Sequence, residues 1–150
     1  MAIYFYVPRD EHGYLSNFTP YGVDLDGVYW PTVEHFFQAA KFEGTDPAHR
    51  DAILRARTPK DAANLGRDRR RRLRPDWEQS KEAVMLRALR KKFATHAAIR
   101  ERLGATGEEE LVENSPSDFY WGVGADGTGR NRLGHLLMQV RRELLSATER

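Results

Sequence analysis

Three polar side chains interrupt an otherwise apolar segment with the sequence WPTVEHFFQAAKF. Glu34, Gln38 and Lys41 follow the spacing i, i+4, i+7, which places them on one line along a helix that turns by about 100° per residue. Phe37 and Phe42 flank that line with aromatic rings. An acid and an amine that are partly desolvated change their pKa values and become suited to proton transfer or nucleophilic attack. The pattern indicates either the floor of a cleft with such chemistry or the solvated side of an ordinary amphipathic helix.

A second group of residues suited to ligand binding lies in a glycine-rich segment near the C-terminus. Gly122, Gly124 and Gly127 match the pattern G-x-G-x-x-G, but no β-α-β unit surrounds them, so the match alone does not indicate a dinucleotide site. Glycines still allow a ligand to approach the backbone and leave N–H groups for phosphate. Asn131 and Arg132, at the expected start of the next helix, add further donors. A surface loop without a ligand has the same composition, so both interpretations stay open.

Arginine dominates the basic residues, with 19 Arg against 5 Lys, and six of the arginines fall within RDRRRRLR, residues 67–74. Guanidinium groups form planar, bidentate contacts with phosphate, so the run predicts either a phosphate or nucleic-acid contact or a solvated loop. Trp77 follows the run, and Trp121 lies three residues after Asp118. A tryptophan in either position can stack on a base or serve as an anchor of the core.

The composition excludes several classes of site. The 150 residues suit one domain with one core, and 40% apolar with 31% charged residues is ordinary for a globular protein. The absence of cysteine excludes disulfides, thiolate nucleophiles and cysteine-type zinc sites, and the five histidines lack ligand spacing. No apolar run approaches the roughly 20 residues that span a bilayer, and the N-terminus MAIYFYVPRD lacks the features of a signal peptide. We therefore expect a cytoplasmic protein without a metal site and without membrane contact.

Local signals predict mostly helices after a short β element. The segment AIYFYV is typical of a strand, and VDLDGVYW predicts a hairpin that turns at Asp26–Gly27. The segment ELVENSPSDFYWGVGADGTG, with its proline and glycines, is expected to form one long loop. Capping residues and apolar periodicity predict a helix that begins near Thr32, one from Asp46–Pro47 to about Arg57, one from Thr58–Pro59 to Gly66, a long one after Pro75, a short one that ends at Gly104, and a last one after Asn131. The expected fold is mainly α: a compact multihelical single domain over residues 1–150 with a small N-terminal β-hairpin.

Five segments together resemble the NADAR family, which is also called YbiA-like. They are LSNF (15–18), WPTVEHFFQAAKF (30–42), LGRD (65–68), RPDWEQSKEAVMLRALRKKF (74–93) and SDFYWGVGADGTGRNRLGHLLMQVR (117–141). The resemblance runs across nearly the whole chain, in order and at compatible spacing, and it implies a mainly α-helical N-glycosidase. Some members of the family are assigned to hydrolysis of ribosylamino-pyrimidine intermediates of riboflavin synthesis, and others to removal of ADP-ribose from guanine bases in DNA.

The resemblance also implies roles for individual residues. The acid of the W-P-T-x-E-H motif falls on Glu34, the lysine of Q-A-x-K-F on Lys41, and the aspartate that precedes Y-W-G on Asp118. These three residues are the catalytic candidates. Val123 departs from the charged or polar residue of some relatives, which affects contacts of the loop more than the chemistry. The implied substrate-binding residues are Ser16, Asn17, Phe18, Gly66, Arg67, Trp77, Trp121, Gly122, Gly124 and Asn131.

The implied reaction breaks the bond between ribose C1 and a nitrogen. Its transition state carries positive charge on the sugar, and a nearby carboxylate stabilises such an oxocarbenium-like state. Glu34 and Asp118 are the candidates for this carboxylate and for the proton transfer. Lys41 offers another route, because a lysine of lowered pKa can capture C1 as a Schiff base. The substrate-binding residues are expected to hold phosphate or pyrophosphate and to flank the sugar or base, and no cofactor or metal is implied.

The expected substrate is ADP-ribosylated guanine in DNA, because the arginine run suits polynucleotide phosphate. A ribosylamino-pyrimidine intermediate of riboflavin synthesis is the alternative within the same enzyme class. A module that binds ADP-ribose or nucleic acid without chemistry, and a DNA-binding protein that uses only the arginine run, are alternatives from other classes. The expected partners are therefore a nucleotide-like small molecule or ADP-ribosylated DNA, and no obligate protein partner is evident.

Overall fold

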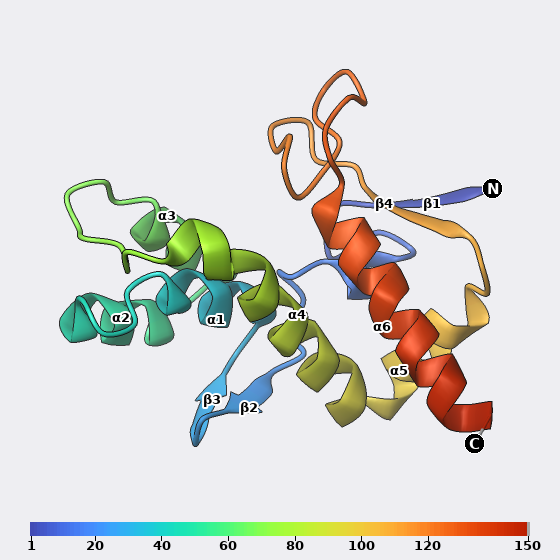
Figure 1. Ribbon diagram of the computed structural model, residues 1–150, viewed down its shortest axis with the longest axis horizontal. Coiled ribbons are helices and arrows are strands. Elements are labelled where there is room, and N and C mark those ends of the chain that lie inside the picture. Colours follow the sequence, from blue (N-terminus) through green and yellow to red (C-terminus); the bar gives the residue numbers. More distant parts are fainter. Residues whose placement is uncertain (150) are drawn as a thin grey trace. The chain divides into compact units, whose positions relative to one another are not determined.

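The computed structural model, shown in Figure 1, describes residues 1–149, and its residues divide into two compact units. The fold is mainly α-helical, as the sequence predicts. The extent of a single domain over residues 1–150 stays a prediction. Unit 2 (Pro20–Thr95) contains β2 (Val23–Leu25), β3 (Val28–Trp30), α1 (Val33–Ala40), α2 (Pro47–Leu54), α3 (Pro59–Gly66) and α4 (Trp77–Thr95). Unit 1 (Met1–Thr19 with residues 96–149) contains β1 (Ala2–Phe5), the short 3-10 helix η1 (Gly13–Leu15), α5 (Ala97–Ala105), β4 (Glu110–Glu113) and α6 (Arg132–Glu149).

Helix α1 is the central helix of unit 2. It begins where the sequence predicts, because the Thr32 side chain accepts a hydrogen bond from the His35 N–H. It packs against α2, α3, α4 and β3, as Figure 1 also shows. All eight of its residues are buried. An ordinary amphipathic helix keeps one side in solvent, so the solvated-face interpretation of its polar line is wrong.

The helices α2 and α3 begin at the predicted caps. Asp46 accepts a hydrogen bond from the backbone N–H of His49, and Thr58 accepts one from the N–H of Asp61. Helix α2 ends at Leu54, earlier than the expected end near Arg57. The reason is local, because a residue that precedes proline avoids the helical region, and Thr58 must be extended to cap α3.

The hairpin of β2 and β3 turns at the predicted dipeptide. Asp26 and Gly27 both have positive φ, 56° and 78°, as a tight two-residue hairpin turn requires. Arg87 of α4 holds the turn from outside, since its guanidinium donates to both carboxylate oxygens of Asp26, at 2.6 and 2.8 Å. The apolar side of α4 reaches the core through Met85, Leu89 and Phe93, whereas Leu86 is half-buried.

Unit 1 is built around a strand that the sequence did not predict. Residues 110–113 were expected to form part of a long loop, but they form β4, which pairs in parallel with β1. The expectation failed because the proline and glycines that suggest a loop all follow this segment, while Leu111 and Val112 are buried. Helix α6 covers β4 and α5, and its Leu133, Leu136, Leu137 and Val140 are buried. No helix among the described residues combines the length and apolarity that would be needed to cross a membrane.

Candidate functional site

The polar line of α1 brings an acid and an amide into direct contact inside unit 2. Gln38 donates a hydrogen bond from Nε2 to Oε2 of Glu34, at 3.2 Å. The two side chains are only 4% and 8% exposed. This contact follows from the i, i+4 spacing, which stacks the two side chains on one side of the helix.

Lys41 completes the line at the residue that ends α1. Its Nζ donates to the backbone carbonyl of Gly66 at 3.5 Å and lies 5.8 Å from the centroid of the Phe37 ring. Burial lowers the pKa of Lys41 below 10.5, the positive charge of Arg67 lowers it further, and the Glu34 carboxylate raises it. Burial dominates, so the amine loses its proton more easily than an exposed lysine does. This is the property that a nucleophilic lysine needs.

Gly66 makes room for the amide of Gln38. A methyl group in its place would overlap the amide atoms of that side chain. The Gln38 Oε1 atom is buried and has no hydrogen-bond partner among the described residues. A buried carbonyl without a hydrogen-bond partner costs free energy, so the Gln38 side chain is held here by its contacts with Glu34 and Gly66. Gln38 was not among the predicted site residues, although its place on the polar line was a signal for it.

Aromatic rings form the support beneath Lys41. Trp77 is 6% exposed, and its ring packs against Phe37 with 5.1 Å between centroids. This position makes Trp77 a part of the core that holds Phe37 under the lysine. Phe42 is fully buried and packs against His49, so it lies in the core of the unit and not beside the polar line as expected. Arg67 follows α3 directly and is exposed.

Unit 1 contains the third catalytic candidate, Asp118. Its Oδ1 accepts hydrogen bonds from the backbone N–H groups of Tyr120 and Trp121, at 2.9 and 2.8 Å. Its own N–H donates to Oγ of Ser115 at 3.2 Å. One carboxylate oxygen of Asp118 therefore holds the turn on which Trp121 lies, and the Trp121 ring packs edge-on against Tyr120.

Asn131 ties the start of α6 to β4. Its Nδ2 donates to the Leu111 carbonyl and its Oδ1 accepts from the Glu113 N–H, both at 2.9 Å. The side chain is 5% exposed, and the residue has a positive φ of 52°, which asparagine tolerates better than most residues. Asn131 lies at the predicted start of the helix, but its side-chain amide forms its hydrogen bonds with β4.

The glycine loop is folded by its own backbone. Gly122 accepts a hydrogen bond from the Asn131 N–H, and the Gly129 N–H donates to the Val123 carbonyl. A side chain at Gly122 would crowd the backbone carbonyl oxygens of Glu113 and Asp118, and Gly124 has a φ of 71°, which favours glycine. The glycines thus allow a defined loop conformation. The composition alone did not distinguish such a loop from a ligand-binding loop.

The segment LSNF lies at the end of η1 in unit 1. Ser16 and Asn17 are 5% and 8% exposed, and Phe18 is half-buried. The Ser16 Oγ accepts a hydrogen bond from the Phe18 N–H at 3.2 Å, so the serine shapes a local turn. The Ser16 carbonyl accepts from Thr19 Oγ1 at 2.7 Å.

Histidine serves structure in α1. The His35 residue is 1% exposed, and its ring contacts Thr32 Oγ1 at 2.8 Å and the Ala56 carbonyl at 3.0 Å. In the part of the chain that the structure describes, no three His, Asp or Glu side chains are grouped as a metal site requires.

Comparison with known proteins gives a consistent result. The model of the NADAR domain matches residues 4–145. An N-glycosidase of Nostoc punctiforme is 51% identical over 145 residues, which cover 96% of this chain and 93% of that protein. The N-glycosidase YbiA of Escherichia coli is 49% identical over 95% of this chain and 88% of its own length. The NMR structure of E. coli YbiA matches with a TM-score of 0.89 at 47% identity, over 98% of this chain and 86% of that one. A riboflavin biosynthesis protein of Vibrio vulnificus is 42% identical over 95% of this chain, but only 38% of that protein is covered. The chain therefore belongs to the NADAR domain family.

Proposed function

We propose that this protein hydrolyses the bond between ribose C1 and the base nitrogen of ADP-ribosylated guanine in DNA. The observation that carries the proposal is the line formed by the buried side chains of Glu34 and Gln38 and the half-buried Lys41, whose pKa is lowered by its partial burial. Lysine and glutamate are seldom buried without a function or a partner. Both enter the reaction in the proposal.

The reaction class rests on the relatives. Two proteins named N-glycosidase match about half of the residues over nearly the whole length of this chain and of their own chains. The chain is therefore a hydrolase that acts on N-glycosyl bonds. A module that only binds ADP-ribose is disfavoured for the same reason.

Glu34 supplies the negative charge for the transition state. As the C1–N bond breaks, positive charge develops on the sugar, and a carboxylate in a buried site stabilises it more strongly than one in water. The hydrogen bond from Gln38 orients the Glu34 carboxylate. Asp118 is our candidate for the second carboxylate, whose orientation is set by the two N–H groups that bind its Oδ1.

Lys41 provides a covalent route to the same products. A glycosylamine opens to an imine at C1, the neutral lysine amine adds to that carbon, and the amine of the base leaves with a proton. Water then adds to the lysine–sugar Schiff base and releases the sugar aldehyde, which closes to ribose. Borohydride reduction during turnover should leave a sugar adduct on Lys41. If no adduct forms on Lys41 while the enzyme turns over its substrate, this route is excluded.

Two substrates separate the proposal from its alternative. We expect the purified protein to release free ADP-ribose from ADP-ribosylated DNA, and Glu34→Ala to lose this activity by about 10²–10⁴-fold, the usual contribution of such a group. A ribosylamino-pyrimidine intermediate is the second candidate, because the V. vulnificus relative is named a riboflavin biosynthesis protein. If the protein hydrolyses only the pyrimidine intermediate and leaves ADP-ribosylated DNA intact, the pyrimidine intermediate is the substrate and the proposal for DNA is wrong.

A further inference from the structure

The loop of residues 67–74, called the arginine loop from here on, divides its six arginines into two sets. The arginines of the first set form ion pairs with aspartates of unit 2. These pairs are Arg70–Asp68, Arg71–Asp46 and Arg74–Asp76, with N–O distances of 3.0, 3.3 and 2.6 Å. Exposed ion pairs of this kind contribute little stability each. Their effect here is to balance the charge of three of the six arginines.

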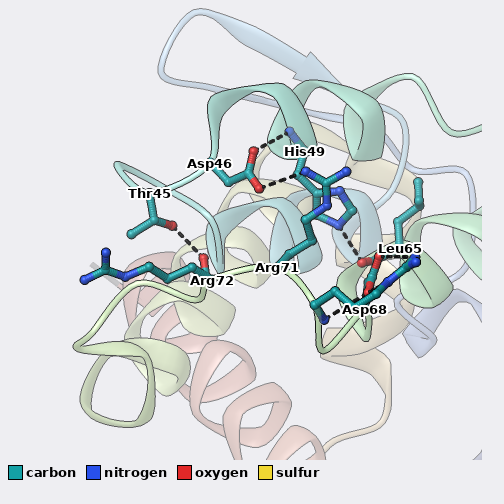
Figure 2. A network of polar contacts seen from close by, with 8 residues as sticks. Thr45, Asp46, His49, Leu65, Asp68, Arg71 and Arg72 are labelled. Carbon is teal, nitrogen blue, oxygen red and sulfur yellow. Dashed lines mark hydrogen bonds and ion pairs between the residues drawn. The ribbon is translucent and has the colours of Figure 1, made fainter.

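Backbone contacts anchor the arginine loop. Figure 2 shows Thr45 donating from Oγ1 to the Arg72 carbonyl, at 2.9 Å. At one end of the loop the Gly66 carbonyl accepts from Lys41 Nζ, and at the other end the Arg74 N–H donates to the Lys41 carbonyl at 2.7 Å. Both ends of the arginine loop are therefore tied to the candidate catalytic lysine.

The second set consists of Arg67, Arg69 and Arg72, whose residues are exposed. Within residues 1–149, their guanidinium groups form no hydrogen bond or ion pair. In Figure 2 the Arg72 side chain points away from the polar network that holds its backbone. An anchored loop thus presents three positive charges that form no ion pair within the described residues, and a fixed backbone lowers the entropy lost when a ligand binds.

We propose that the arginine loop binds the DNA strand that carries the modified base, with Arg69 and Arg72 on backbone phosphates. This inference rests on the proposed function and names what distinguishes its substrate from a small nucleotide. Arg67 acts on the pKa of Lys41, so we assign it to the ADP-ribose itself. Arg69 and Arg72 come later in the loop, and we assign them to the phosphates of the DNA strand that flank the ADP-ribosylated base. Guanidinium groups suit this task because they bind phosphate bidentately.

Binding of unmodified DNA tests the loop without any chemistry. A fluorescently labelled single-stranded oligonucleotide is titrated with wild-type protein and with Arg69→Gln/Arg72→Gln, at several salt concentrations, by anisotropy. The matched control is Arg55→Gln/Arg57→Gln, which removes two exposed arginines elsewhere in unit 2. We expect the loop variant to bind at least about 10-fold more weakly at low salt, and its salt slope to fall by about 1.4, from about 0.7 per phosphate contact. The control should keep the wild-type slope. Equal slopes in the loop variant and the wild type, or no binding by the wild type, would overturn the inference.

Turnover of two substrates supplies the second test. On an ADP-ribosylated oligonucleotide the loop variant should show a KM raised about 10-fold with kcat nearly unchanged, since phosphate contacts add uniform binding. On ADP-ribosylated guanosine, which has no flanking phosphates, kcat/KM should stay within about two-fold of the wild type. Equal losses on both substrates would refute the assignment of the loop to the flanking strand. If the wild type cleaves neither substrate, the proposed function fails, and the anisotropy experiment still decides whether the loop binds DNA.

Discussion

The polar residues of α1 and those of the loop before α6 are used in opposite ways. On α1, Gln38 binds Glu34, and the same carboxylate acts on the pKa of Lys41. In the loop, the side chains of Asp118 and Asn131 bind backbone groups of their own unit. Both regions contain predicted site residues, but the catalytic candidates of α1 act on each other, whereas Asp118 and Asn131 bind backbone groups.

This difference distinguishes residues that act in the reaction from residues that stabilise the fold. A side chain that satisfies buried backbone groups stabilises the fold, and its loss leaves those groups unpaired. A buried charge that is poorly compensated costs stability and is retained for function. Substitutions on the α1 line should therefore reduce activity and leave stability intact, whereas substitutions in the loop should reduce stability first.

The largest effect is expected at Lys41. Lys41→Met removes an amine whose burial already lowers its pKa, so activity should fall by about 10²–10⁴-fold while the melting temperature stays equal or rises. Lys41→Arg keeps the charge but cannot act as a neutral nucleophile. Steady-state kinetics and thermal denaturation of both variants provide the measurement. Substantial activity in Lys41→Arg would mean that the lysine acts through its charge on Glu34 and not by attack on the sugar.

Asn131→Ala should show the opposite behaviour. It removes both hydrogen bonds to β4 and places alanine at a positive φ of 52°. Each buried group left unpaired costs about 1–3 kcal/mol, so we expect a loss of about 2–4 kcal/mol in the free energy of unfolding by urea. Asn131→Asp keeps the acceptor and should lose less. A stable but inactive Asn131→Ala protein would mean that Asn131 contributes to the reaction and not to the stability of the fold.

Gly66→Ala is expected to have an intermediate effect. The added methyl group displaces the Gln38 amide and with it the Glu34 carboxylate, so kcat should fall about 10-fold, the scale of a small misplacement of reacting groups. The matched control is Gly104→Ala in α5, where the methyl group meets only an ordinary contact with Leu145. The control should retain its activity and gain up to about 1 kcal/mol from helix propensity. Equal activity of the two variants would mean that Gln38 does not position Glu34.

Local signals in the sequence predicted the elements around the polar line. The cap at Thr32, the turn at Asp26–Gly27 and the placement of Glu34 and Gln38 on one line of α1 depend on neighbouring residues only, and each is confirmed. The family resemblance added the roles of the three catalytic candidates, which stay predictions.

Features that depend on distant parts of the chain were not predicted from the sequence. The burial of every residue in α1 comes from packing against α2, α3 and α4, and no periodicity within one helix reveals it. The pairing of β1 with β4 joins segments about a hundred positions apart, and the clamp of Asn131 on β4 depends on that pairing. The space beneath Gln38 depends on Gly66, whose composition signal indicated only a helix end.

The smallest effect is expected at Arg67, and it concerns pH. The charge of Arg67 lowers the pKa of Lys41, so Arg67→Gln should raise that pKa. A reaction that needs the neutral amine increases as pH rises through this pKa, and the rising limb of the kcat profile should move to higher pH in the variant. Stability follows the same sign. The folded protein releases the Lys41 proton at lower pH than the unfolded chain, so the free energy of unfolding rises with pH between the lowered pKa and 10.5. Arg67→Gln should make that rise smaller, while Arg69→Gln leaves both profiles unchanged. A kcat limb that stays in place in Arg67→Gln would show that the neutral form of Lys41 does not limit the reaction.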